Sequence, residues 1–199
     1  MTAKTLSQQE EHLFRILSSQ RFLRMEGLGN EVPFFIYPYD PELALEVADV
    51  KKRVKNKLAN AGIQVREINL YDLAVALIRE RGDWDDVIEL ETSVGKSEFG
   101  EVVRSMLNPE VHLAPAIRER LLDGAFDIFF LTGIGEVFPF IRSHNVLNNL
   151  QSVVTNKPML MFFPGRYEFS ATLGSSLVLF GRLKDDQYYR AKNIIDQEA

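Results

Sequence analysis

Two short runs of the chain are almost wholly apolar, and they constrain the fold more than any other feature. They read FDIFFLTG at residues 126–133 and KPMLMFFPG at residues 157–165. Strands that are buried on both faces have continuous apolar runs of this kind, whereas a strand with one wet face alternates apolar and polar residues. The two runs therefore predict central strands of a largely parallel sheet, which needs helices on both of its faces.

Two runs nearer the N-terminus predict further strands of the same sheet. VPFFIYPYDP at 32–41 predicts a strand that ends near Tyr37, and IQVREINL at 63–70 predicts the next one. Asp40 is the expected N-cap of the helix between them, and Gly62 is its expected C-terminal stop. Strand, helix and strand in this order predict a right-handed crossover between parallel strands.

The remaining segments before residue 126 predict helices. Ser7 and Glu10 have the spacing of a capping box at the start of an amphipathic helix over residues 7–20. Every pattern from about residue 71 to residue 123 is helical. The sequence therefore predicts a helical insertion (about 71–123) between the second and third strands.

The C-terminal part is expected to add one strand and one helix. SLVLFG at 176–181 predicts the fifth strand, and a last helix is expected from Asp185 to about Ile195. The predicted fold class is therefore α/β, a single domain over residues 1–199 with a mostly parallel five-stranded sheet flanked by helices. This arrangement resembles the topology of P-loop NTPases, although the chain has no Walker A motif.

Composition excludes several classes of function. The 199 residues contain no cysteine, which removes disulfides, thiolate nucleophiles and iron–sulfur clusters. The net charge of -5 lacks the basic excess of a stand-alone nucleic-acid-binding protein. No apolar run is long enough to cross a bilayer and no secretory signal is present, so we expect a cytoplasmic protein without membrane contact.

A Gly-x-Gly turn at Gly133 and Gly135 follows the third strand, in the place where many α/β proteins hold a phosphate. The dinucleotide-binding pattern requires a third glycine where Phe138 stands, and the complete Gly-x-x-x-x-Gly-Lys-Ser/Thr pattern of a P-loop is absent, because Gly95-Lys96-Ser97 is preceded by Leu90 where that pattern has its first glycine. Glu136 adds a negative charge that would repel a phosphate there. We therefore expect a tight strand-to-helix turn or a protein contact, and no cofactor.

The helix predicted from Pro139 has a polar face of unusual composition. One side of this helix is apolar, and the other carries Arg142, His144, Asn145, Asn148 and Asn149. Asparagine is a weaker helix former than Glu or Lys, which would solubilise the face equally well. Because Asn and Arg are directional hydrogen-bonding groups, the face is predicted either to bind a partner or to bond buried groups of its own protein.

Arg166 and Arg182 follow the fourth and fifth strands, at the edge where open α/β sheets bind ligands. Together with Arg142 they predict a site for an anion or an acidic protein loop. The alternative is that they pair with carboxylates of the same chain, such as Glu168.

The charged runs have two possible roles. KKRVKNK at 51–57 is the only basic run, and it places Lys51, Lys52, Lys55 and Lys57 on the helix after the first strand. This helix surface is either a solvated face or a weak DNA-contacting site. The acidic cluster around Trp84, which comprises Asp83, Asp85 and Asp86, predicts a helix start and no metal site.

Three blocks of sequence resemble the BrxB family of bacteriophage exclusion (BREX) defence systems. They read FLTGIGEVFPFIRSHNVLNNLQ, PMLMFFPGRYEFS and LVLFGRLKDDQYYRAKNII. The resemblance implies a cytoplasmic protein without established catalytic activity, and the sequence has neither a Gly-x-Ser-x-Gly nor a His-Glu-x-x-His motif. It also implies an adaptor that binds PglZ, a protein of the alkaline phosphatase superfamily, beside ATPase and methyltransferase components.

Under this interpretation the protein reaches DNA only through its partners. Two alternatives remain open at the level of the sequence: a degenerate nucleotide-binding regulatory domain, and an accessory subunit that contacts DNA.

Overall fold

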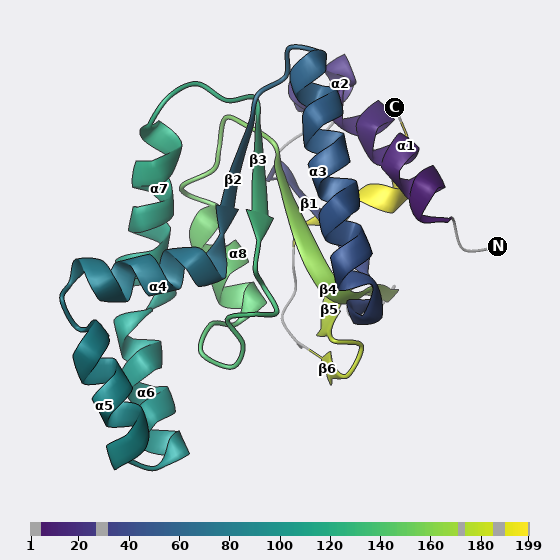
Figure 1. Cartoon of the computed structure of the whole chain (residues 1–199). Coiled ribbons are helices and arrows are strands. Elements are labelled where there is room, and N and C mark those ends of the chain that lie inside the picture. The colour runs from purple at the N-terminus through teal and green to yellow at the C-terminus, as the bar shows by residue number, and fades with distance from the viewer. Residues whose placement is uncertain (1–4, 27–31, 171–173, 185–189, 199) are drawn as a thin grey trace.

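The computed structural model describes residues 5–26, 32–170, 174–184 and 190–198. In these residues a seven-stranded sheet lies between two layers of helices (Figure 1). Its parallel strands follow the order β2–β3–β4–β1–β7. They span β1 Phe34–Tyr39, β2 Val65–Asn69, β3 Ile128–Thr132, β4 Met159–Ser170 and β7 Lys192–Asn193. The predicted α/β class with a mostly parallel sheet is confirmed.

The parallel strands bury both of their faces. In β3, Phe129 and Leu131 point into one apolar layer, whereas Ile128 and Phe130 point into the other, and all four are fully buried. Successive strand residues point to opposite faces, so a strand covered on both sides is apolar at nearly every position, and in β3 the buried polar residue Thr132 comes last. This is the physical basis of the apolar runs in the sequence.

One helical layer contains α1 (Leu6–Leu17), α2 (Gln20–Leu23), α3 (Ala44–Asn60) and the short 3-10 helix η3 (Ile194–Asp196). A 3-10 turn, η1 (Pro41–Leu43), precedes α3. The Asp40 carboxylate caps this turn by accepting from the Glu42 amide at 3.0 Å, as predicted. Gly62 ends the segment with φ of +78°, also as predicted.

The other layer contains α4 (Leu70–Glu80), the π-helical turn η2 (Pro109–Leu113), α7 (Ala114–Leu122) and α8 (Ser143–Leu150). Two more helices, α5 (Trp84–Ser93) and α6 (Lys96–Met106), lie at the far end of this layer and project away from the sheet (Figure 1). The helical insertion between the second and third strands is therefore confirmed.

The N-terminal helix has a different cap from the predicted one. Its capping box is formed by Thr5 and Gln8, not by Ser7 and Glu10. Glu10 is instead buried at 8% exposure and pairs with two cations of α3. The helix also ends at Leu17 rather than near residue 20, because Ser19 caps the following helix α2.

The predicted fifth strand forms, but it runs in the opposite direction. Strand β4 is twelve residues long and continues past the parallel sheet, where β5 (Gly174–Leu179) pairs with it antiparallel. The two-residue strand β6 (Leu183–Lys184) then pairs with β5. The chain thus returns as an antiparallel extension of β4 and not as a fifth parallel strand.

The predicted last helix is wrong where it can be compared with the structure. Residues 185–189 lie outside the described residues, and Lys192–Asn193 forms strand β7 beside Phe35 and Ile36 of β1. Burial of Ala191 and Ile194 on either side of β7 holds this segment against the sheet. Contacts with a distant strand therefore override the local helical pattern.

Leucine truncation provides a direct measure of the two-sided core. Leu131→Ala should lower the free energy of unfolding by about 2–5 kcal/mol, because it leaves a cavity in a fully buried strand. Leu45→Ala is the matched control, since Leu45 is 83% exposed, and its effect should stay below about 0.5 kcal/mol. Urea titration of both variants measures the difference, and equal losses would contradict the burial of β3.

Candidate functional site

The Gly-x-Gly turn is explained by contacts with its own protein. Gly133 has φ of +77°, and a Cβ there would lie 2.3 Å from Oδ1 of Asn69. That oxygen accepts hydrogen bonds from the amides of Tyr71 at 2.8 Å and Asp72 at 3.3 Å, so it caps α4. Gly133 therefore lets the end of β3 pass close to the cap that starts the neighbouring helix.

The second glycine of the turn meets the connection that follows β5. A Cβ at Gly135 would lie 2.9 Å from the ring of Phe180 and 2.9 Å from Pro164. The protein's own side chains thus pack on the turn in the place where a nucleotide-binding protein would leave space for phosphate. The structure agrees with the tight-turn interpretation of both glycines.

Helix α8 begins later than predicted, at Ser143 rather than at Pro139. The carbonyl of Val137 accepts from the amides of Phe140 and Ile141, which closes a turn that buries Val137 and Ile141. Arg142 then takes the N-cap position of the helix. The proline therefore belongs to the turn before the helix.

The two faces of α8 are those that the sequence predicts. Val146, Leu147 and Leu150 are buried against the core. On the opposite face Arg142, Asn145 and Asn148 are exposed, and His144 and Asn149 are partly exposed.

Two side chains of this polar face are not used by the protein's own bonds. Asn149 donates through Nδ2 to the Asn145 carbonyl at 2.8 Å, which is a bond within the helix. Within the described residues, the side-chain amides of Asn145 and Asn148 form no hydrogen bond. Internal bonding therefore does not account for these two amides.

A groove between α7 and α8 borders this face. Its volume is about 440 Å³, and its lining combines the apolar Ala114, Pro115 and Val153 with the charged Glu110, Arg118 and Glu119. Asn149 lies at its edge, and Leu122 of α7 lines it while remaining 76% exposed. This groove was not predicted from the sequence. One signal for it was present, because adjacent residues of a helix point in different directions, so Leu121 and Leu122 cannot both face the core.

A chain of contacts joins Arg142 to the carboxyl edge of the sheet. The Arg142 guanidinium lies 5.3 Å from the ring centre of Phe138. The Phe138 and Phe180 rings meet edge to face, with centres 6.2 Å apart. Phe180 and Arg182 then line a hollow of about 500 Å³ that also contains Asp40 of the β1–α3 turn. The structure thus brings Arg142 and Arg182 to one edge through two aromatic rings that the sequence did not single out.

Arg166, the third predicted arginine, is held by its neighbours. It donates to the Gly181 carbonyl at 3.1 Å and lies 3.5 Å from the Glu168 carboxylate. For this residue the structure shows the internal pairing that the sequence left as an alternative.

Tyr39 lies at the same edge, at the end of β1. Burial, and then the nearby charge of Glu136, raise the pKa of Tyr39 to about 12. Its hydroxyl therefore stays protonated at neutral pH and can donate a hydrogen bond.

The basic run on α3 is largely neutralised by carboxylates of the same chain. Lys51 and Lys55 both donate to the carboxylate of Glu67 on β2. Lys57 donates to Glu10 of α1 at 2.6 Å, and Arg53 donates to the same carboxylate at 2.7 Å. Lys52 is exposed. Of the four lysines considered for DNA contact, three therefore already have carboxylate partners.

These ion pairs determine the ionisation of the two carboxylates. The hydrogen bond from Lys57 lowers the pKa of Glu10 against the opposing effect of burial. Burial alone would raise the pKa of Glu67, but the hydrogen bonds from Lys51 and Lys55 outweigh it, and the net pKa is lowered. Both groups are therefore ionised at neutral pH and attach α3 to its neighbours.

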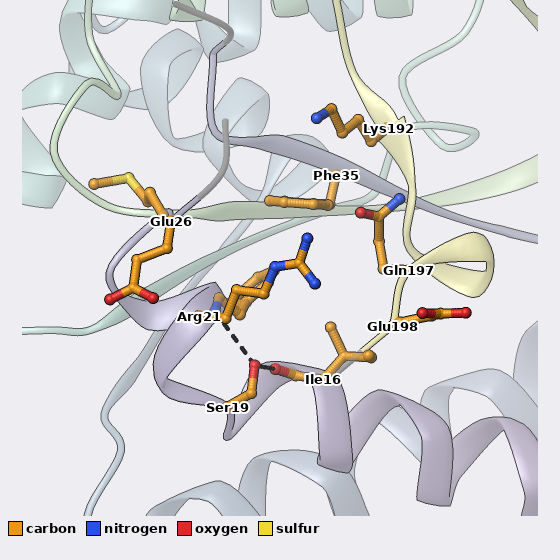
Figure 2. A pocket seen from close by; sticks show the side chains of 10 residues that line it. Ile16, Ser19, Arg21, Glu26, Phe35, Lys192, Gln197 and Glu198 are labelled. Atoms are coloured by element: carbon orange, nitrogen blue, oxygen red, sulfur yellow. Dashed lines mark hydrogen bonds between the residues drawn. The ribbon is translucent and has the colours of Figure 1, made fainter. Parts of the chain in front are cut away.

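A small cavity of about 50 Å³ lies where α1, α2 and the C-terminal segment meet (Figure 2). Arg21, Glu26 and Glu198 surround it, and Ser19 at its floor donates to the Ile16 carbonyl at 2.7 Å. Ligand pockets usually measure about 300–1,000 Å³. This cavity is of a size for ordered water and not for a cofactor.

The acidic cluster near Trp84 lies at a helix start, as predicted. Asp83 is the N-cap residue of α5 but makes no capping side-chain bond, and Asp85 and Asp86 lie in the first turn. Across the described part of the chain, no group of three His, Asp or Glu side chains is arranged to hold a metal ion. In that same part, no helix is both long and apolar enough to cross a membrane.

Comparison with known proteins finds relatives along nearly the whole chain. The profile of the family described as BREX protein BrxB matches residues 66–194. A BREX protein BrxB of Bacillus cereus (strain H3081.97) is 35% identical over 201 residues, which cover 98% of this chain and 100% of the relative. A BREX protein BrxB of Escherichia coli O9:H4 (strain HS) is 28% identical over 179 residues, covering 90% of this chain and 86% of the relative. No solved structure gives a significant match.

Alanine at Gly133 tests the packing explanation of the turn. Gly133→Ala should lower the free energy of unfolding by about 2 kcal/mol or more, through the strained φ and the clash with Asn69. Gly95→Ala is the matched control, because Gly95 has φ of -72° and open space around its Cβ position. Urea unfolding measures both variants, and a fully tolerated Gly133→Ala would contradict the described turn.

The lowered pKa of Glu67 predicts a particular pH dependence. Its ion pairs should stabilise the fold above the ordinary value of 4.5 and lose this effect as the pH falls through the folded-state pKa. Glu67→Gln should therefore be less stable than the unmodified chain by about 1–3 kcal/mol at neutral pH. The difference should shrink in acid.

Unfolding measured from neutral to acidic pH checks this prediction. Glu11→Gln, at an exposed glutamate in the middle of α1, serves as the control and should show little difference at any pH. A Glu67→Gln deficit that stays constant down to acid would contradict the ion pairs.

Proposed function

The chain belongs to the BrxB family of BREX phage-defence proteins, and from this premise we propose that it is a non-enzymatic adaptor that binds PglZ. In this proposal the polar face of α8 and the groove beside it receive the partner. The bound chain helps to assemble the complex that modifies DNA and restricts phage. The ATPase and methyltransferase components are then reached through that assembly, and DNA is contacted only indirectly.

The observation that carries this proposal is the unbonded amide pair Asn145 and Asn148 beside a groove that has both apolar and charged side chains in its lining. Protein interfaces combine a buried apolar centre with a polar rim that supplies directional hydrogen bonds. Leu122, at 76% exposure, offers the apolar anchor, and the asparagine amides offer both donors and acceptors. Glu and Lys have a higher helix propensity than Asn, so a helix face that only contacts solvent would be more stable with Glu or Lys at these positions.

The carboxyl edge of the sheet extends this surface. Arg142 stacks on Phe138, so its guanidinium loses less side-chain freedom on binding than a fully mobile arginine would. Arg182 lines the adjoining hollow with Phe180. Arginine and aromatic residues are enriched at interface centres, which supports including this edge in the docking surface.

The two alternatives have less support. If the sheet has a P-loop-like topology, the β1–α3 turn would be the phosphate site, and there the chain has Asp40, Pro41 and Glu42. The carboxylates of Asp40 and Glu42 would repel the phosphates of a nucleotide. DNA contact through α3 would require its lysines to leave the carboxylates of Glu67 and Glu10.

Paired alanine substitutions test the adaptor proposal. Asn145→Ala with Asn148→Ala should weaken PglZ binding by roughly tenfold to a hundredfold, as expected for the loss of interface hydrogen bonds. Asn56→Ala with Asn60→Ala, at two exposed asparagines of α3, is the matched control and should bind normally. Alanine favours the helix in all four positions, so lost binding cannot be attributed to unfolding.

Co-purification followed by calorimetry with purified PglZ provides the measurement. Wild-type affinity in both double variants would show that the interface is elsewhere.

A further inference from the structure

Helices α5 and α6 form a hairpin, here called the arm (residues 83–106), that projects from the body of the molecule (Figure 1). It buries few of its own side chains. In α5 Val87 is buried, and in α6 Gly100 and Val103 are buried. A helix in a globular protein usually covers a core with an apolar stripe several residues long. Most of the arm's surface therefore has no partner within the described structure.

The base of the arm is nevertheless anchored to the body. Phe99 meets Phe140 edge to face, with ring centres 6.0 Å apart. At the start of α5 the guanidinium of Arg79 lies 4.5 Å from the ring centre of Trp84. Trp84, Phe99 and Met106 all pack against the main core cluster. The arm is thus held at a defined position, which lowers the entropy loss of docking.

Apolar side chains are exposed on both helices of the arm. Ile88 of α5 is 48% exposed, and Val102 of α6 is 36% exposed. Each could add an apolar contact to a surface whose main feature is its charge.

The arm also carries all of the chain's net charge. Between Asp83 and Glu101 it has seven acidic side chains, against two basic ones, Lys96 and Arg104, so its net charge is -5. The net charge of the whole chain is also -5, so the rest of the molecule is neutral in sum. Within the described residues, none of these seven carboxylates takes part in a salt bridge.

Helix stability accounts for some of these charges and leaves three without a role. Asp85, Asp86 and Glu98 lie in first turns, where a negative charge interacts favourably with the helix dipole. Glu89, Glu91 and Glu101 lie beyond the first turns and have no such function. These three charges are therefore not explained by the stability of their own helices.

We propose that the arm docks a positively charged protein surface with an apolar contact site, presented by another BREX component. The inference goes beyond the proposed function, because it assigns a second docking surface, separate from the α8 face, to the molecule. An adaptor that joins two proteins requires two such surfaces. Charge complementarity identifies the occupant: an acidic arm repels nucleic acid and attracts a basic protein surface.

A second copy of the chain is a poorer occupant. The basic run that could receive the arm already donates to carboxylates of its own chain, with Lys51 and Lys55 on Glu67 and Lys57 on Glu10. Docking the arm there would require these internal ion pairs to break.

Charge reversal tests the proposal. The arm variant carries Glu89→Lys, Glu91→Lys and Glu101→Lys. The control variant carries Glu11→Lys, Glu46→Lys and Asp49→Lys at exposed positions of α1 and α3, so both variants have the same total charge. Each tagged full-length chain is co-expressed with the remaining BREX proteins of its system and purified at low and at high salt. Urea unfolding checks that both variants are folded.

We expect one BREX partner to bind the arm variant roughly tenfold or more weakly. The same partner should dissociate from the unmodified chain at high salt. At low salt it should remain bound to the control variant. The double variant Ile88→Ser with Val102→Ser should weaken the binding of the same partner, although it changes no charge.

Retention of every partner by the arm variant would overturn the proposal, and so would equal loss from arm and control variants. Arm-dependent self-association of the purified chain in sedimentation would assign the surface to a second copy instead. Because the α8 asparagine variants are tested separately, failure of the adaptor proposal and failure of this one can be told apart.

Discussion

Strand β3 and the first half of β4 have no exposed residue on either face, so water must be excluded from both sides of the sheet at once. Helices on both faces meet this requirement, and it determines where the other elements lie. The α1–α3 layer closes one face, and the helical insertion together with α8 closes the other. Since α8 uses its apolar side for this purpose, its asparagine-rich side must face outward. The candidate site is therefore a consequence of how the core is covered.

Local patterns predicted much of the fold because their physical causes are local. Apolar runs marked β3 and β4, and Asp40 and Gly62 marked the two ends of the helix between β1 and β2. The direction of β5 and the strand at Lys192–Asn193 were missed, because each depends on pairing with a distant strand. The polar residues of α8 were predicted from periodicity. The groove and the Phe138–Phe180 contact were not, since they join segments that lie far apart in the sequence.

Electrostatics divides the surface in a way that the linear sequence conceals. The basic run on α3 looks like the main charged feature, yet Glu67 and Glu10 neutralise most of it and use it to attach α3 to β2 and α1. The net negative charge is thereby left on the arm. The α8 face carries amides and Arg142 beside a groove with apolar and charged side chains in its lining. Two surfaces of different chemistry on one small chain are what the proposed adaptor role requires.

The most direct test of the adaptor account is the accessibility of α8 in the complex with PglZ. Because the chain contains no cysteine, Asn148→Cys introduces a single thiol on the polar face of the helix. Its rate of alkylation can be measured in the free chain and at saturating PglZ, with Asn56→Cys on α3 as the reference position. The account predicts that PglZ slows alkylation of Asn148→Cys and leaves Asn56→Cys unchanged. Equal rates for Asn148→Cys in the free and bound states would contradict it.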